Sequence, residues 1–67
     1  METFKKRLKE LRTDKKISQK GLASVIGTNN SSICDWECGR SEPSIETILK
    51  LCDFFGVSAD YLLGRED

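Results

Sequence analysis

Polar start signals and glycine stop signals divide the chain into short helical segments, and this punctuation constrains its fold more than any other feature. Four start residues precede apolar patterns with helical spacing: Ser18, Asn29, Ser44 and Ser58. Side-chain oxygens of serine and asparagine accept hydrogen bonds from the free N–H groups of a helix's first turn. Four glycines follow the same segments, where a left-handed residue can end a helix: Gly27, Gly39, Gly56 and Gly64. The sequence therefore predicts four short helices after residue 17.

The apolar residues predict one further helix and the core. Phe4, Leu8 and Leu11 form a helical stripe, which predicts a first helix from about Glu2 to Asp14. In the other four helices we expect these residues to face the core: Leu22, Ala23, Val25, Ile26, Ile33, Trp36, Ile45, Ile48, Leu49, Cys52, Phe55, Tyr61, Leu62 and Leu63. There is no strand signal and no repeat. The predicted fold is all-α, with short connections, in a single domain over residues 1–67.

Charge is unevenly distributed along the chain. The 11 basic and 11 acidic residues give a net charge of zero, whereas nucleic-acid-binding domains are usually basic. Residues 1–27 nevertheless carry eight basic and three acidic side chains (+5), and residues 28–67 carry three basic and eight acidic ones (−5). A chain polarised in this way can hold a polyanion on one side. Lys5, Lys6 and Lys9 are expected to be only the solvated face of the first helix.

The three cysteines indicate the compartment. Their odd number and their spacing match neither a disulfide framework nor a paired C-x2-C zinc site, so we expect reduced thiols in a reducing cytoplasm. Cys52 is expected to pack as a small apolar residue. Cys34 and Cys38 stand four residues apart, on adjacent helical turns, which leaves open that a soft metal or an oxidant links them. No metal site and no cofactor is otherwise expected, and the sequence predicts neither a signal peptide nor a membrane-spanning run.

The second and third predicted helices, joined by a tight turn, have the architecture that places one helix in the DNA major groove. A set of elements occurs in register over about residues 7–63: Ser18-Gln19, Leu22-Ala23, Gly27, Ser32-Ile33, Trp36-Glu37, Gly39, Glu42-Pro43-Ser44, Gly56-Val57-Ser58 and Tyr61-Leu62-Leu63. With these elements the chain resembles the Cro and repressor type helix-turn-helix (Xre) family of bacterial and phage transcriptional regulators. The resemblance implies a compact five-helix lambda-repressor-like DNA-binding domain, with its helix-turn-helix motif over about residues 18–38.

The resemblance also implies a DNA-binding surface. Its expected residues are Ser18, Gln19, Asn29, Asn30, Ser31, Cys34, Asp35, Gly39 and Arg40. Gln19 would contact phosphate and brace the third helix, and Arg40 would supply a charge for phosphate. Asn30 is the expected base-reading residue, because asparagine can form a bidentate pair with adenine; the alternative is that it only helps to cap the helix. Arg12 and Glu37 match a family ion pair that ties the first helix to the third.

Three positions depart from the family pattern: Cys34, Asp35 and Cys38. Phosphates repel an acid that faces DNA unless the acid accepts a hydrogen bond from cytosine N4. Asp35 is therefore expected either to specify a cytosine or to turn to solvent. The two cysteines replace hydroxyl and basic residues, which weakens the phosphate contact expected after Trp36.

The function that these features favour is a sequence-specific DNA-binding transcriptional regulator, most simply a repressor, in the bacterial cytoplasm and at the nucleoid when bound. Its expected partners are a double-stranded DNA operator and a second copy of the chain, because one such domain makes few contacts and family members pair on two-fold half-sites. The expected dimer surface is the last helix and the loop over residues 40–43. A further C-terminal domain stays open, because residues 64–67 resemble the start of a linker in longer repressors. A toxin partner also stays open, because regulators of this kind include antitoxins of toxin pairs.

Two other classes of protein compete with this interpretation. A protein-interaction module, such as an antitoxin-like adaptor with weak or no DNA binding, would suit the neutral total charge. An enzyme is not expected, because the chain has no histidine for a Ser-His or Cys-His pair and no glycine-rich phosphate loop. A domain of 67 residues also has little chain left over for an enclosed active site.

Overall fold

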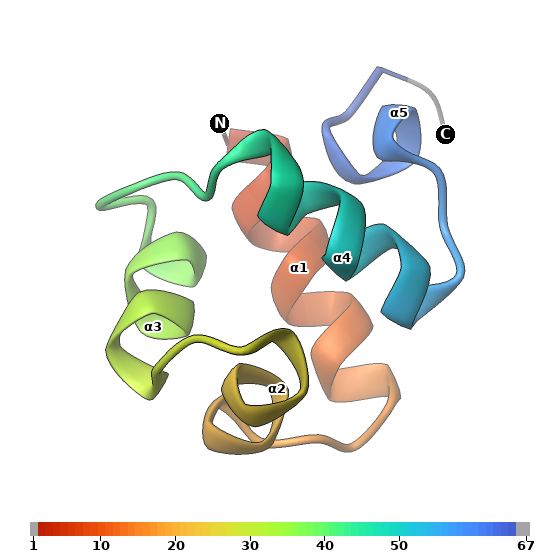
Figure 1. Cartoon of the computed structure of the whole chain (residues 1–67). Helices are drawn as coiled ribbons and strands as arrows, with labels where there is room; N and C mark the ends of the chain where they lie inside the picture. The colour runs from red at the N-terminus through yellow and green to blue at the C-terminus, as the bar shows by residue number, and fades with distance from the viewer. Residues whose placement is uncertain (1, 66–67) are drawn as a thin grey trace.

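The computed structural model describes residues 2–65, which form five α-helices joined by short connections (Figure 1). They are α1 (Glu2–Asp14), α2 (Gln19–Ile26), α3 (Asn30–Cys38), α4 (Ile45–Phe55) and α5 (Ala59–Leu62). Residues 2–65 contain no strand, and none of their helices combines the length and the apolar character needed to cross a bilayer. The predicted all-α fold of five helices is confirmed.

Each predicted start residue caps the helix that follows it. Ser18 Oγ accepts a hydrogen bond from the Gly21 N–H at 2.9 Å, and Asn29, Ser44 and Ser58 cap α3, α4 and α5 in the same way. The helices α2, α3 and α4 end at glycines whose φ angles are 87°, 81° and 69°, in the left-handed region that glycine adopts without strain. Because these signals act within one helical turn, the bounds of these helices follow closely from the sequence. The last helix differs, because Leu63, in the right-handed region, caps α5 one residue before the predicted Gly64.

The core lies where the apolar faces of all five helices meet. In Figure 1, α1 runs behind α4, the pair α2 and α3 closes one side, and α5 packs at the other end. The buried side chains are Phe4, Leu8, Leu22, Ala23, Ile26, Ile33, Trp36, Ile48, Leu51, Cys52 and Leu62. Trp36 and Cys52 are thus core residues, as predicted.

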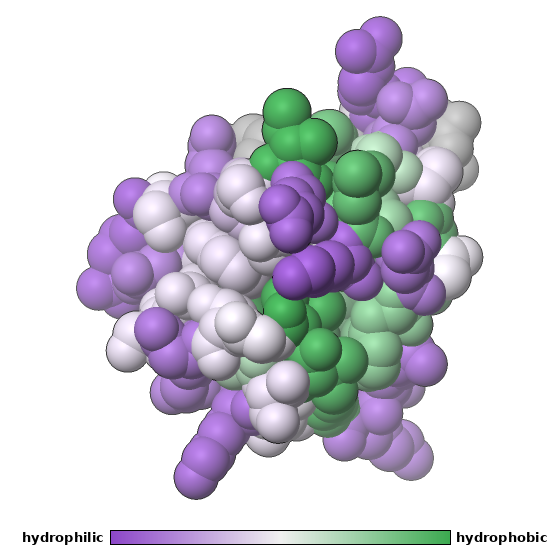
Figure 2. All heavy atoms as spheres, in the orientation of Figure 1, coloured by the Kyte–Doolittle hydropathy of each residue, from purple (hydrophilic) through white to green (hydrophobic). Residues whose placement is uncertain are grey.

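Three predicted core residues lie on the surface instead. Val25, Ile45 and Leu49 are 54%, 78% and 54% exposed, and the apolar surface around α4 and α2 is visible in Figure 2. Leu51 was not singled out in the sequence but is fully buried. The buried face of α4 is therefore rotated away from residues 45 and 49 and toward Leu51 and Cys52. Spacing alone predicted an apolar stripe but not where its edge lies, because packing against α1, α2 and α5 sets that edge.

Gly21, in the first turn of α2, has a steric explanation. A Cβ atom at this position would stand 3.0 Å from Ile17 Cγ1 and 3.2 Å from Ser18 Oγ. The connection from α1 folds back over the start of α2, and the missing side chain leaves room both for the Ile17 side chain and for the helix cap.

Removing the cap of α4 should destabilise the domain. In Ser44→Ala, the Thr47 N–H loses the hydrogen bond that it donates to Ser44 Oγ at 3.2 Å. The free energy of unfolding should fall by about 1 kcal/mol, measured by urea denaturation. Ser41→Ala is the matched control, because Ser41 lies exposed in the preceding loop. Equal losses for the two variants would contradict the capping role.

Candidate nucleic-acid interface

The helices α2 and α3 form a two-helix unit around a short turn. Gly27 ends α2, and Asn29 caps α3 after a single intervening residue. The two helices pack against each other, with Ala23 of α2 and Ile33 of α3 both buried in the shared core. The small side chain of Ala23 allows the helices to approach closely. The turn and the packing together fix the direction of α3 relative to α2.

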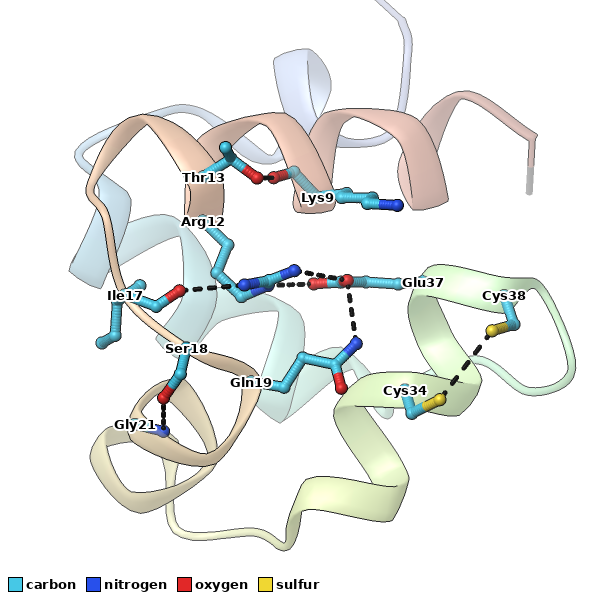
Figure 3. A network of polar contacts seen from close by, with 10 residues as sticks. All are labelled: Lys9, Arg12, Thr13, Ile17, Ser18, Gln19, Gly21, Cys34, Glu37 and Cys38. Carbon is cyan, nitrogen blue, oxygen red and sulfur yellow. Dashed lines mark hydrogen bonds and ion pairs between the residues drawn. The ribbon is translucent and has the colours of Figure 1, made fainter.

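An ion pair ties α3 to α1. Arg12 Nε donates to Glu37 Oε2 at 2.6 Å, and Arg12 Nη2 donates to Glu37 Oε1 at 3.1 Å (Figure 3). The side chains are 15% and 3% exposed, so water competes little for either group. Two parallel N–H···O bonds between planar groups fix orientation as well as distance. The structure thus brings together the two residues that the family resemblance paired.

Two further contacts extend this ion pair into a polar node, formed by Arg12, Glu37, Gln19 and the Ile17 carbonyl. Gln19 Nε2 donates to Glu37 Oε1 at 3.2 Å, and Arg12 Nη1 donates to the Ile17 carbonyl at 2.9 Å (Figure 3). The hydrogen bond to Glu37 raises the pKa of the Arg12 guanidinium, and the charge of Glu37 adds to this rise while burial opposes it. Helices α1, α2 and α3 therefore meet at one carboxylate, and the connection between α1 and α2 is tied to it through Arg12. Gln19 braces α3, as expected.

The first turn of α3 separates a capping residue from exposed polar ones. Asn29 Oδ1 accepts a hydrogen bond from the Ser32 N–H at 2.8 Å, so the amide of Asn29 serves as the cap. Asn30 and Ser31 follow, and both are exposed. The alternative expectation for Asn30 was that it only helps to cap the helix, but Asn29 fills that role. Asn30 and Ser31 present their side chains at the start of the helix.

Asp35 and Arg40 lie together at the other end of α3. Arg40 Nε stands 3.6 Å from Asp35 Oδ1, and the two side chains are 69% and 41% exposed. The Arg40 N–H also donates to the Asp35 carbonyl at 2.9 Å, which closes the helix end. The sequence predicted that Asp35 either specifies a cytosine or turns to solvent, and it did not predict a pair with Arg40. The two residues are close because the chain reverses at Gly39, a contact that helical spacing does not predict.

Gly39, predicted to approach the DNA backbone, is exposed and lies beside α1. A Cβ atom at this glycine would stand 3.2 Å from Lys5 Cδ and 3.5 Å from Lys5 Nζ. The Lys5 side chain thus lies over Gly39 at the end of α3, while its ammonium group pairs with Glu2 of the same helix at 3.1 Å. Lys6 and Lys9 are exposed, as predicted. Sequence reasoning missed Lys5 because α1 and Gly39 meet only in the folded chain.

The remaining predicted residues lie on both helices of the two-helix unit. Ser18 and Gln19 stand at the start of α2, where free backbone N–H groups and the helix dipole favour an anion such as phosphate. Cys34 is half-buried and Cys38 is exposed, with their sulfur atoms 3.9 Å apart (Figure 3). Together these positions give a polar helix edge with an anion-favouring helix start beside it. This arrangement suits contact with a nucleic-acid duplex.

Comparison with known proteins assigns this architecture to a family. A family model described as Helix-turn-helix matches residues 8–62. Two similar proteins come from Bacillus subtilis (strain 168). The SPbeta prophage-derived uncharacterized HTH-type transcriptional regulator YonR is 40% identical over 60 residues, covering 90% of this chain and 56% of YonR. The HTH-type transcriptional regulator ImmR is 37% identical over 62 residues, covering 92% of this chain and 49% of ImmR. The chain thus spans about half the length of these two relatives.

A solved structure has the same fold. The crystal structure of the P22 c2 repressor protein in complex with synthetic operator 9T matches with a TM-score of 0.84 and 34% identity, over 88% of this chain and 89% of that one. That repressor is similar to this chain in fold and, over the matched region, in sequence.

Neutralising Glu37 should destabilise the domain much more than neutralising its neighbour Asp35. Glu37→Gln leaves the charge of Arg12 largely buried without a counter-ion, so the free energy of unfolding in urea should fall by about 3 kcal/mol. Asp35→Asn is the control, and it should have far less effect because water and salt screen its exposed pair with Arg40. Equal effects of the two substitutions would show that the buried carboxylate has no special role.

Proposed function

Because the chain belongs to the helix-turn-helix family, we propose that it is a sequence-specific DNA-binding transcriptional regulator, acting as a repressor, that places α3 in the major groove of an operator. One observation carries the proposal: α3 exposes a polar edge while the buried Glu37 carboxylate holds the helix in one orientation. A base-reading helix needs both properties, since its side chains must reach base edges at a defined angle. We propose that it acts in the bacterial cytoplasm, at the nucleoid.

The size and chemistry of α3 support this placement. A helix with its side chains is about 10–12 Å across, and the major groove of B-DNA is about 12 Å wide. Asn30 and Ser31 are exposed at the start of α3. The Asn30 amide offers a donor and an acceptor, which match adenine N7 and N6, and the Ser31 hydroxyl can contact a base or a phosphate. Asn30 is therefore the proposed base-reading residue.

Phosphate contacts would come from the two flanking segments. The start of α2, at Ser18 and Gln19, favours an anion through its backbone N–H groups. Arg40, 69% exposed beyond the end of α3, carries a charge that pairs with the Asp35 carboxylate and also contacts the Cys38 thiol. Such a pair is weak enough to exchange for phosphate. Once Arg40 has moved to phosphate, Asp35 can accept a hydrogen bond from cytosine N4.

The relatives support the same function. The P22 c2 repressor, which shares this fold, was solved in complex with a synthetic operator, and YonR and ImmR are HTH-type transcriptional regulators. The P22 c2 likeness supports repressor activity for this chain, and both that likeness and the geometry of α3 support DNA binding.

A homodimer on two half-sites is part of the proposal. One domain of this size makes too few contacts for tight specific binding, and proteins of this architecture pair on half-sites one helical turn apart. Ile45, the first residue of α4, adjoins the loop over residues 40–43 and is 78% exposed. We propose that this side chain contributes to the surface between the copies, together with α5.

A second candidate function is a protein-interaction module of the antitoxin-like adaptor kind. The zero net charge and the exposed apolar side chains of α4 favour it, because both suit a protein partner better than a polyanion. The two functions differ in one respect that is easily measured, which is preference for a particular DNA sequence.

Two substitutions at opposite ends of α3 should separate base reading from phosphate contact. Asn30→Ala should reduce discrimination between the promoter beside this protein's own gene and a scrambled fragment by about 1–3 kcal/mol. Arg40→Ala should weaken binding to both DNAs to a similar extent, since phosphate contacts carry no sequence information. Fluorescence anisotropy with labelled duplexes at fixed salt measures both effects.

Either of two outcomes would contradict the assignment of these residues. Asn30→Ala could leave the preference for the promoter unchanged, or Arg40→Ala could abolish the preference while keeping the affinity for scrambled DNA. Because Asn30 and Arg40 are both exposed, neither substitution should alter the helical circular dichroism spectrum, which serves as the folding control.

The dimer surface is tested by the oligomeric state. Ile45→Ser should raise the dimer dissociation constant at least about tenfold, since it removes a large apolar side chain from the proposed contact. Val25→Ser is the matched control, because Val25 is another exposed apolar residue but lies on α2. Sedimentation equilibrium measures both variants. An equal change in the two variants would rule out a specific role for Ile45.

A further inference from the structure

Two thiols share the outward edge of α3 with the proposed base-reading residue. Asn30, Cys34 and Cys38 are spaced four residues apart, which places them one above another along the helix. Cys38 is exposed and Cys34 half-buried, and their sulfur atoms lie 3.9 Å apart (Figure 3). The third cysteine, Cys52, is buried in the core on α4. The pair is therefore a local dithiol, separate from the remaining thiol.

The spacing of the sulfur atoms suits one bound ion. Two thiolates at about 2.3 Å from a tetrahedral zinc ion lie roughly 3.8 Å apart, close to the distance in this structure. A disulfide would instead need Cβ atoms about 3.5–4.5 Å apart, whereas residues at i and i+4 of a helix have theirs about 5–6 Å apart. A disulfide would therefore distort the last turn of α3, and an ion would not.

The charges around the pair favour a thiolate at Cys38. The hydrogen bond from the Arg40 guanidinium lowers the pKa of Cys38, and the hydrogen bond with Cys34 adds to this effect. The same contact with Cys38 raises the pKa of Cys34, so one member of the pair ionises before the other. The Asp35 carboxylate acts in the opposite direction on Cys38, but more weakly than Arg40.

We propose that Cys34 and Cys38 form a chelating site for a soft, thiophilic divalent cation of the zinc and cadmium type. Two metal–sulfur bonds form, and the two thiol protons pass to solvent, so binding requires no oxidant. Within residues 2–65, no cluster of three or more histidine, cysteine or acidic groups is placed to hold a metal. Water or small-molecule ligands would therefore fill the remaining positions, which makes the ion exchangeable.

The position of the site gives it a regulatory consequence, which rests on the proposed function. A cation with its water ligands at Cys34 and Cys38 would project from the edge of α3 that carries Asn30. This edge faces the major groove in the proposed complex. Occupancy would therefore lower affinity for the operator by obstructing contact, while the fold held by the Glu37 node stays intact.

A cadmium titration without DNA tests the site directly. Cadmium is added to the reduced protein, and the thiolate-to-cadmium charge-transfer absorbance is followed. We expect one ion per chain, and Cys34→Ser should weaken binding at least about 100-fold because chelation is lost. Cys52→Ala is the matched control. Like Cys34→Ser it retains two thiols, but these are Cys34 and Cys38, so it should bind cadmium as tightly as the unsubstituted protein does. Equal affinity of Cys34→Ser and the unsubstituted protein would overturn the proposal.

Two further measurements separate the possible causes of failure. Circular dichroism establishes that each variant is folded, and Cys38→Ser, at an exposed position, provides a second loss of chelation. Operator affinity is then measured with and without cadmium. A decrease that is absent in Cys34→Ser supports the regulatory consequence, and an unchanged affinity at full occupancy overturns it. If the metal-free protein shows no operator preference, the proposed function fails, but the absorbance titration still decides whether the site exists.

Discussion

The Glu37 carboxylate is the group on which the position of α3 depends. Arg12 of α1, Gln19 of α2 and the turn carbonyl at Ile17 all converge on the polar node around it, and the carboxylate is almost entirely removed from water. A buried charge is costly unless its partners are in place, so alternative packings of α3 against α1 and α2 would each leave one of these groups unsatisfied. The node therefore contributes to specifying one arrangement of the helices, in addition to any net stability.

In this arrangement, α3 has an inward face that packs and an outward face that is exposed. Ile33, Trp36 and Glu37 point inward and anchor the helix to the core and to the node, whereas Asn30 and Cys38 point outward. The helical period keeps the two sets on different faces, so a substitution on the outer edge can alter recognition without disturbing the fold. The proposed recognition surface and the dithiol pair occupy that same outer edge, so any ligand of the thiols would affect the proposed DNA contact.

The sequence predicted most reliably what is determined within one helical turn. The caps at Ser18, Asn29, Ser44 and Ser58 lie where the residue types placed them, since each bonds a backbone group three residues away. The buried edge of α4 was predicted less well, because tertiary packing rather than spacing exposes Ile45 and buries Leu51. The pairing of Arg12 with Glu37 came from the family resemblance, since no local signal links residues 25 positions apart. The approach of Lys5 to Gly39 had no sequence signal for the same reason.

The central claim is that this domain binds a particular DNA sequence through α3. The most direct test is the salt dependence of binding to the promoter beside its own gene and to a scrambled fragment of equal length. The account predicts a preference for the promoter of at least about 10³, with affinity that falls steeply as salt rises. Equally weak binding to both DNAs would contradict it and would direct attention to a protein partner.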